Sequence, residues 1–124
     1  MARAAAAAGT IVGVVFLCLM MNIEIASAAT YTVGDDAGWS YDVSPWPLGK
    51  NFKVGDVLVF NYKPWQHNVV VVNQAGFDNC SVPPGSKTYD TGADSIPVVK
   101  GYNFFISSMG NDCHLGLAMT LYAD

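Results

Sequence analysis

The sequence predicts an all-β domain built as a sandwich of two sheets with seven or eight strands. Short apolar runs recur about every ten residues and are separated by clusters of Gly, Pro, Asn and Asp, which form turns. These runs are rich in Val, Ile, Phe, Tyr and Trp, the residue types that favour strands. No segment after residue 28 keeps a helical period over a useful length. We therefore expect an antiparallel sandwich or barrel.

The first half of this domain contains short strands joined by irregular loops. Pro45 and Pro47 exclude a helix between the second and third strands. The run that ends at Tyr62 is too apolar to leave one face in water, which predicts a buried strand. The extended segments expected here are 31–33, 39–41, 52–54 and 57–62.

The second half repeats this pattern. Residues 67–73 are a β-branched run typical of a core strand, and 73–89 form a loop with at most one or two helical turns. Pro97 assigns residues 95–99 to a sheet edge, because proline cannot donate to the strand ladder. The last two strands are 102–106 and 116–122. The expected core aromatics are Trp39, Trp46, Phe52, Phe60, Tyr62, Phe104 and Phe105.

Residues 1–28 have the features of a secretory signal peptide. Arg3 supplies the positive start, residues 11–21 the apolar segment, and residues 26–28 a cleavage site of small residues. An uncleaved signal anchor is the alternative, although the apolar run is short for a membrane span. We expect a secreted, extracellular domain at 29–124, with no lipid-anchor signal at its C-terminus.

Charge excludes some partners. After residue 28 the charged side chains are only Lys and Asp, and the chain has a formal net charge of −4. No basic patch is available to neutralise phosphates, so we expect no nucleic-acid partner. An anionic membrane surface is disfavoured for the same reason. We expect a monomer whose scattered charges form a solvated surface.

Two cysteines remain after the signal peptide, Cys80 and Cys113, because Cys18 lies within it. Two cysteines in a small secreted domain usually form a disulfide, with metal binding and nucleophilic chemistry as the alternatives. By the chain-entropy model, this bond would stabilise the domain by about 3–4 kcal/mol.

Several segments together resemble the phytocyanins, plant relatives of the blue copper proteins, and above all the secreted plantacyanin branch. The resemblance extends over residues 31–122 and rests on Tyr-Thr-Val-Gly at 31–34, Gly-Trp at 38–39, and the segments 52–62 and 67–73. It implies a cupredoxin-like Greek-key β-sandwich with a disulfide between Cys80 and Cys113. It also implies electron transfer through copper as the activity of the family.

The resemblance assigns four copper-ligand positions, and three of them carry other residues here. His67 matches the first histidine of the family. When the family pattern is aligned on Cys113, Ser107 stands at the cysteine position, Asp112 at the second histidine and Leu117 at the axial ligand. A type 1 copper centre needs two imidazoles, a thiolate and a weak axial ligand. A serine hydroxyl stays protonated near neutral pH and is a poor ligand for Cu(I), so we expect no copper cofactor.

Other residues near this end offer alternatives. His114 would be a replacement imidazole, but neighbouring residues on an extended segment point to opposite faces, which turns it away from Asp112. A hydrolase built from Ser107, Asp112, His67 and His114 is disfavoured because the sequence contains no nucleophile elbow. Asn79 is a weak glycosylation acceptor, because the middle residue of its sequon is Cys80.

The sequence thus predicts a secreted phytocyanin-like domain that has lost its type 1 copper centre, like the nodulin-like members of the family. Such a domain would not be an enzyme. It would act in binding or signalling at the plant cell surface, with a protein, peptide or carbohydrate partner. Trp65 and Met109, near the expected site, would form an apolar patch for that partner. The alternative for Met109 is that it fills the space that copper would occupy. The alternative is an electron-transfer protein with an altered copper site.

Overall fold

The computed structural model describes residues 28–124. The predicted signal peptide, except for its last residue, therefore lies outside the described residues. The described chain contains seven strands, one short α-helix and one 3₁₀ turn. No helix among the described residues is long and apolar enough to cross a membrane. In chain order the elements are β1 (Thr30–Thr32), η1 (Asp35–Ala37), β2 (Val57–Asn61), β3 (Val69–Val72), α2 (Gln74–Asn79), β4 (Lys87–Tyr89), β5 (Ala93–Pro97), β6 (Gly101–Ile106) and β7 (Ala118–Ala123).

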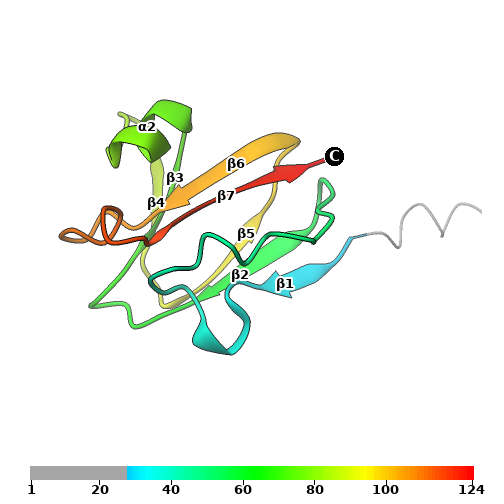
Figure 1. Cartoon of the computed structure of the whole chain (residues 1–124), viewed down its shortest axis with the longest axis horizontal. Helices are drawn as coiled ribbons and strands as arrows, with labels where there is room; N and C mark the ends of the chain where they lie inside the picture. Colours follow the sequence, from blue (N-terminus) through cyan, green and yellow to red (C-terminus); the bar gives the residue numbers. More distant parts are fainter. Residues whose placement is uncertain (1–27) are drawn as a thin grey trace, which may run out of the picture.

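The strands form two sheets packed face to face, which confirms the predicted sandwich (Figure 1). The smaller sheet has the order β1-β2-β5, and the larger has the order β4-β3-β6-β7. All pairs are antiparallel except β1 and β2, which run parallel. The expectation of a fully antiparallel sandwich was therefore wrong at this edge. The long irregular connection between β1 and β2 supplies the crossover that parallel pairing requires.

The core lies between the sheets and is dominated by aromatic rings. Trp39, Phe60 and Phe105 are at most 1 % exposed. Phe60 contacts both of the others, edge to face against Trp39 and tilted against Phe105, with ring centroids 5.1 Å apart in each pair. Such pairs contribute about 0.5–1.5 kcal/mol each beyond area burial. Of the other expected core aromatics, Phe52 is buried, and Trp46, Tyr62 and Phe104 are partly buried.

Strand β3 is buried on both faces, which explains its unbroken run of valines. Val69 joins the core between the sheets, whereas Val70 and Val72 join a second cluster that contains Ile106 and Cys113. α2 contacts β3 and β6, and Phe77 of α2 packs against this second cluster. The α2 helix begins at its N-cap Asn73, whose side chain accepts a hydrogen bond of 2.8 Å from the Gly76 N–H.

Three local predictions were wrong. Residues 39–41 do not form a strand: the backbone of Trp39 makes one hydrogen bond to Asn61 and its indole another to Asn68. The predicted loop at 73–89 contains β4 as well as the short helix. β4 is only three residues long and exposes two of them, so its sequence has too little apolar alternation to reveal it. The expected extended segment at 52–54 forms no strand, and only Phe52 makes an isolated bridge, to Ala123. The boundaries of the remaining strands shift by up to two residues.

The predicted disulfide joins Cys80 to Cys113, with the Cα atoms 5.6 Å apart and a sequence separation of 33 residues. Cys80 caps the C-terminus of α2 in the left-handed conformation. Cys113 lies in the connection between β6 and β7, here called the site loop (residues 107–117). The disulfide therefore ties the site loop to the helix that covers the larger sheet.

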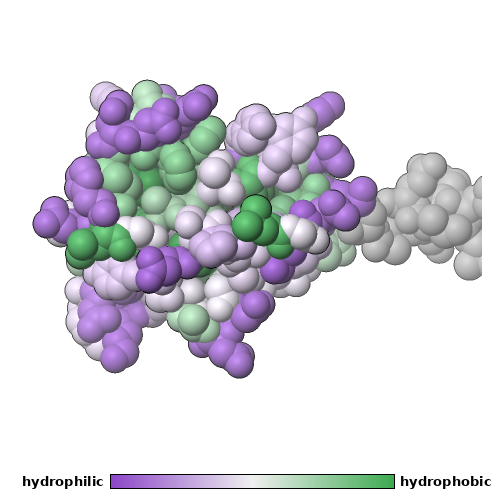
Figure 2. Space-filling view, in the orientation of Figure 1, coloured by the Kyte–Doolittle hydropathy of each residue, from purple (hydrophilic) through white to green (hydrophobic). Residues whose placement is uncertain are grey.

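The site loop and the chain termini lie at opposite ends of the sandwich. In Figure 1 the orange-red site loop is at the left, whereas the start of β1 and the C-terminus are at the right. We call these the loop end and the terminal end. Figure 2 shows polar side chains over α2 with apolar surface beneath them. A hollow of about 340 Å³ is lined there by residues that include Phe77, Tyr102 and Phe104.

Candidate functional site

The fold brings together the four positions that the resemblance assigns to copper ligands. The site loop is closed at its base by a hydrogen bond of 3.1 Å from the Ser107 N–H to the Leu117 carbonyl. A second bond, of 2.9 Å, runs from the Leu117 N–H to the Asp112 carbonyl. His67 precedes β3, whose Val70 pairs with Ile106 at the end of β6. The strand register therefore sets His67 beside the site loop.

The Asp112 carboxylate is the centre of this site. Its Oδ2 accepts a hydrogen bond of 2.7 Å from the Ser107 hydroxyl and lies 2.7 Å from the His67 Nδ1. Its Oδ1 accepts a third bond, also of 2.7 Å, from the Tyr41 hydroxyl. Asp112 is 6 % exposed and Ser107 is fully buried. We call these four residues the Asp112 network.

The Asp112 network favours the ionised carboxylate. Burial by itself raises the pKa of Asp112, but the hydrogen bonds from Tyr41, Ser107 and His67 and the charge of His67 outweigh it. The pKa of Asp112 is therefore lowered from its ordinary value. The same contact acts on the phenol: its hydrogen bond to Asp112, with burial and the carboxylate charge, raises the pKa of Tyr41.

A second group of hydrogen bonds supports the network from the β3 side. The Asn68 side chain and Ser108 exchange two bonds, of 2.9 Å and 2.8 Å, which join the start of β3 to the site loop. The Trp39 indole N–H donates to the Asn68 carbonyl at 2.8 Å. Because Trp39 is buried in the core, this bond anchors the segment of His67 and Asn68 to the interior.

Leu117 and His114 differ in their surroundings. Leu117 is fully buried and belongs to the core cluster, so the axial-ligand position carries a packed apolar side chain. His114 is exposed, although it follows Cys113 directly in the site loop. Its side chain is absent from the Asp112 network, whose histidine is His67.

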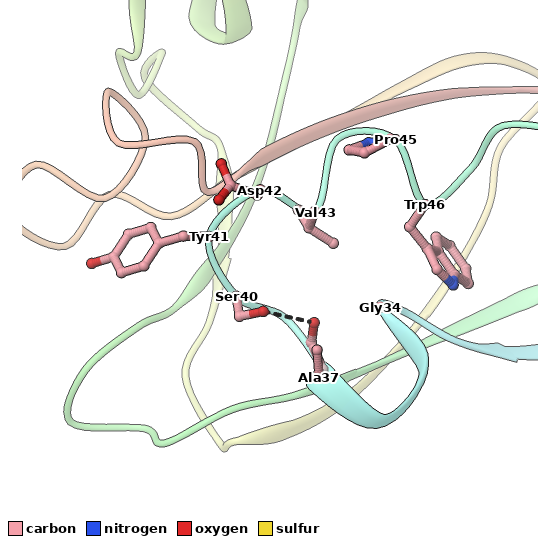
Figure 3. A pocket seen from close by; sticks show the side chains of 9 residues that line it. Gly34, Ala37, Ser40, Tyr41, Asp42, Val43, Pro45 and Trp46 are labelled. Atoms are coloured by element: carbon pink, nitrogen blue, oxygen red, sulfur yellow. Dashed lines mark hydrogen bonds between the residues drawn. The ribbon is translucent and has the colours of Figure 1, made fainter.

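Tyr41 is a site residue that sequence reasoning missed, because it was assigned to a strand. Figure 3 shows the Tyr41 side chain projecting toward the site loop, and Tyr41 also lines a hollow of about 330 Å³ together with Val43 and Trp46. Its neighbour Asp42 has a positive φ of 64°, which marks a turn rather than a strand. A turn-forming Asp after an aromatic residue is the one signal the sequence offered, and it is weak.

The side chains at the four positions do not fit a type 1 copper centre. They offer one imidazole, one hydroxyl, one carboxylate and one aliphatic group, with no thiolate. The hydroxyl and the imidazole nitrogen Nδ1 are already bound to Asp112. Within residues 28–124 no cluster of three or more His, Cys, Asp or Glu side chains is placed to hold a metal ion.

The network is also the wrong arrangement for a serine nucleophile. In a catalytic triad the histidine lies between the serine and the carboxylate and takes the proton from the serine. Here Asp112 lies between Ser107 and His67, and the Ser107 hydroxyl donates to the carboxylate. Ser107 is fully buried, so a substrate carbonyl has no route to its oxygen. The geometry supports structural roles for these side chains.

Comparison with known proteins gives a consistent family assignment. A family model described as a plastocyanin-like domain matches residues 37–117. The chain is 44 % identical over 113 residues to a chemocyanin from Lilium longiflorum, covering 91 % of this chain and 90 % of that protein. It is 45 % identical over 105 residues to a basic blue protein from Arabidopsis thaliana, covering 85 % and 81 %.

A solved structure agrees with these sequence relatives. The cucumber basic protein, a blue copper protein, superposes with a TM-score of 0.75 at 44 % identity, covering 77 % of this chain and 99 % of that one. The similarity to this blue copper protein extends along most of the described chain, including the two sheets and the site loop. The chain belongs to the phytocyanin family of plastocyanin-like domains.

Proposed function

We propose that this protein is a secreted phytocyanin domain that forms no type 1 copper centre and acts as an extracellular binding or signalling protein. The observation that carries the proposal is the Asp112 network. At three of the four ligand positions it places Asp112 and the two side chains, Ser107 and His67, that bind its carboxylate. The fourth position holds the buried Leu117.

Copper binding would have to compete with this network. A metal ion at this end would have to take the His67 imidazole from a carboxylate that is itself buried. Asp112 would then lose one of the three hydrogen bonds made to its buried carboxylate, which is unfavourable. Ser107 offers no soft donor in compensation, because its hydroxyl remains protonated. The network therefore stabilises the copper-free state.

A binding role is supported by apolar side chains around the loop end. Trp65 is 72 % exposed and Leu115, in the site loop, is 59 % exposed. Met109 is half-buried. Exposed aromatic side chains are frequent energetic centres of interfaces. The partner classes that we propose are an extracellular protein, a peptide or a carbohydrate, bound without enzymatic turnover.

The second candidate is an electron-transfer protein with an altered copper site. Two observations favour it: several relatives are named as blue copper proteins, and His67 keeps an imidazole beside a carboxylate. In such a site Asp112 would ligate through oxygen, which favours Cu(II) over Cu(I). The reduced Cu(I) state of such a centre would be less stable than that of a thiolate site.

A calorimetric Cu(II) titration of the secreted protein, followed by visible absorption, separates the two candidates. The proposal predicts weak binding, no intense blue band, and similar weak binding by the His67→Ala variant. His114→Ala is the matched control, because it removes the exposed imidazole and leaves the network intact. Tight one-to-one binding that His67→Ala abolishes and His114→Ala spares would overturn the proposal in favour of the altered copper site.

A further inference from the structure

The terminal end contains a buried carboxylate, Asp56, in the turn before β2. Asp56 is 1 % exposed. Its Oδ1 accepts a hydrogen bond of 2.8 Å from the Ala29 backbone nitrogen, and its Oδ2 accepts one of 2.9 Å from the Lys53 backbone nitrogen. Both carboxylate oxygens are thus bound by main-chain N–H groups.

Among residues 28–124, no cationic side chain forms an ion pair with Asp56. The ion pair between described side chains is the one that joins His67 to Asp112, at the loop end. Lys53 reaches Asp56 through its main chain rather than its ammonium group. A buried carboxylate without a cation is costly, because hydrogen bonds alone replace only part of its hydration. The environment of Asp56 therefore favours a positive charge at one of its two donors.

The position of the Ala29 nitrogen is set by the sheet. The Val57 N–H donates to the Ala29 carbonyl at 2.9 Å, and Thr30 pairs with Val57 in the parallel ladder of β1 and β2. Ala29 is therefore fixed on both sides, through its carbonyl by β2 and through its nitrogen by Asp56. Ala28 and Ala29 are themselves exposed, so the peptide bond between them is accessible.

We propose that cleavage between Ala28 and Ala29 converts the Ala29 nitrogen into the cationic partner of Asp56. Hydrolysis of this bond by a signal peptidase consumes one water molecule. It leaves a carboxylate on Ala28 and an α-ammonium group on Ala29. The new ammonium then forms an ion pair with the buried Asp56 carboxylate. The inference rests on the proposed secretion but not on the proposed loss of copper.

This pairing makes the cleavage position matter to the folded domain. Removal of one residue more would delete the nitrogen that Asp56 binds and the Ala29 carbonyl that accepts from the Val57 N–H. Retention of extra residues would leave an uncharged amide at the same place. A free amine at Ala29 therefore stabilises the fold more than either alternative, and processing at this bond completes the terminal end.

The test compares three forms of the secreted protein whose N-termini are defined by intact mass. These are the protein that begins at Ala29, the same chain acetylated at its N-terminus, and a chain with Gly-Ser inserted before Ala29. Each is combined with Asp56→Asn, and the exposed Asp78→Asn is the matched charge control. We expect acetylation or extension to lower the melting temperature by about 5–10 °C. Asp56→Asn should lower it more in the free-amine form than in the other two.

Three results would overturn the inference. The first is a natural N-terminus other than Ala29. The second is an acetylated or extended protein that melts within about 1 °C of the free-amine form, far below the shift a buried ion pair implies. The third is an Asp56→Asn effect that is equal in all three forms. If Asp56→Asn fails to fold, the first two results still decide. None of these depends on copper, so failure here and failure of the copper titration are distinguishable.

Discussion

Asp112 and Asp56 are buried aspartates at opposite ends of the same sandwich, and they are bound by different kinds of donor. Asp112 at the loop end is bound by side chains, two hydroxyls and an imidazole. Asp56 at the terminal end is bound by two main-chain N–H groups. A hydroxyl can rotate and accept a hydrogen bond, whereas a main-chain N–H can only donate. The loop end can therefore adapt to a changed side chain, and the terminal end cannot.

This difference separates the tasks of the two ends. The terminal end is part of the sheet, because the Asp56 carbonyl also accepts a hydrogen bond of 2.9 Å from the Val98 N–H. The loop end lies outside the sheets and is held by the disulfide and by side-chain hydrogen bonds. In a β-sandwich, loops carry changes in function while the strands preserve the fold. The proposed loss of copper would be such a change, because all four residues of the Asp112 network lie outside the strands.

The largest expected effect comes from replacing each carboxylate by its amide. In Asp56→Asn, the amide NH₂ would face a main-chain N–H, so we expect a loss of about 3–5 kcal/mol in the free energy of unfolding. In Asp112→Asn, the NH₂ can face the Tyr41 hydroxyl, which can accept, so we expect a loss of about 1–2 kcal/mol. Urea denaturation of both variants measures the difference. Equal losses would remove the contrast between the two ends.

Leu117 tests whether the loop end is packed as well as hydrogen-bonded. Because Leu117 is fully buried, Leu117→Ala should cost about 2–4 kcal/mol through a cavity. Leu117→Met conserves volume and should cost less than about 1.5 kcal/mol. Thermal denaturation of the two variants checks this order. A Leu117→Ala variant as stable as the parent would mean that the axial position is not part of the core.

Acid pH should weaken the loop end through Asp112. Because the pKa of Asp112 is lowered in the fold, its contribution to stability is fully present above its unfolded pKa of about 3.9 and is lost as the pH falls through the folded value. The free energy of unfolding, measured by denaturation at a series of pH values, should therefore fall more steeply between pH 7 and about pH 2 for the parent than for Asp112→Asn. If the free energies of unfolding of the two proteins fall in parallel with pH, Asp112 is not preferentially ionised in the fold.

The smallest effect concerns Tyr41, the most exposed member of the Asp112 network, at 44 %. Tyr41→Phe removes one donor and leaves Ser107 and His67 on the carboxylate, so the melting temperature should change less than in any variant above. The phenol itself offers a sharper readout. Its pKa is raised by the bond to Asp112, so in Asp112→Asn it should return toward about 10 in an ultraviolet titration. An unchanged pKa would place Tyr41 outside the network.

Much of the fold could be predicted because its strands carry strong local signals. The valines of β3 and the aromatics of β2 and β6 show burial directly in the sequence, and the two remaining cysteines pair as expected. The parallel pairing of β1 and the short β4 could not be found, because pairing direction leaves no trace in so few residues. Asp56 was also missed, since a Gly-Asp turn carries no sign of the main-chain donors that bind its side chain.

The site was predicted as four positions but not as a network. The family pattern, aligned on Cys113, names the residues that stand at those positions. It cannot show that Ser107 and His67 both bind Asp112, because that depends on how the site loop closes on itself. Tyr41 comes from an irregular segment 71 residues away in sequence, so no local pattern connects it to Asp112.

The most direct test of the account is the visible absorption spectrum, with one equivalent of Cu(II), of the parent and of Ser107→Cys/Asp112→His/Leu117→Met. The variant supplies a thiolate, a second imidazole and an axial thioether around His67, with the disulfide confirmed by counting one free thiol. We expect an intense blue band in the variant and none in the parent. A blue band in the parent, or a folded variant that binds copper no better than the parent, would contradict the claim that residues 107, 112 and 117 determine the loss of copper.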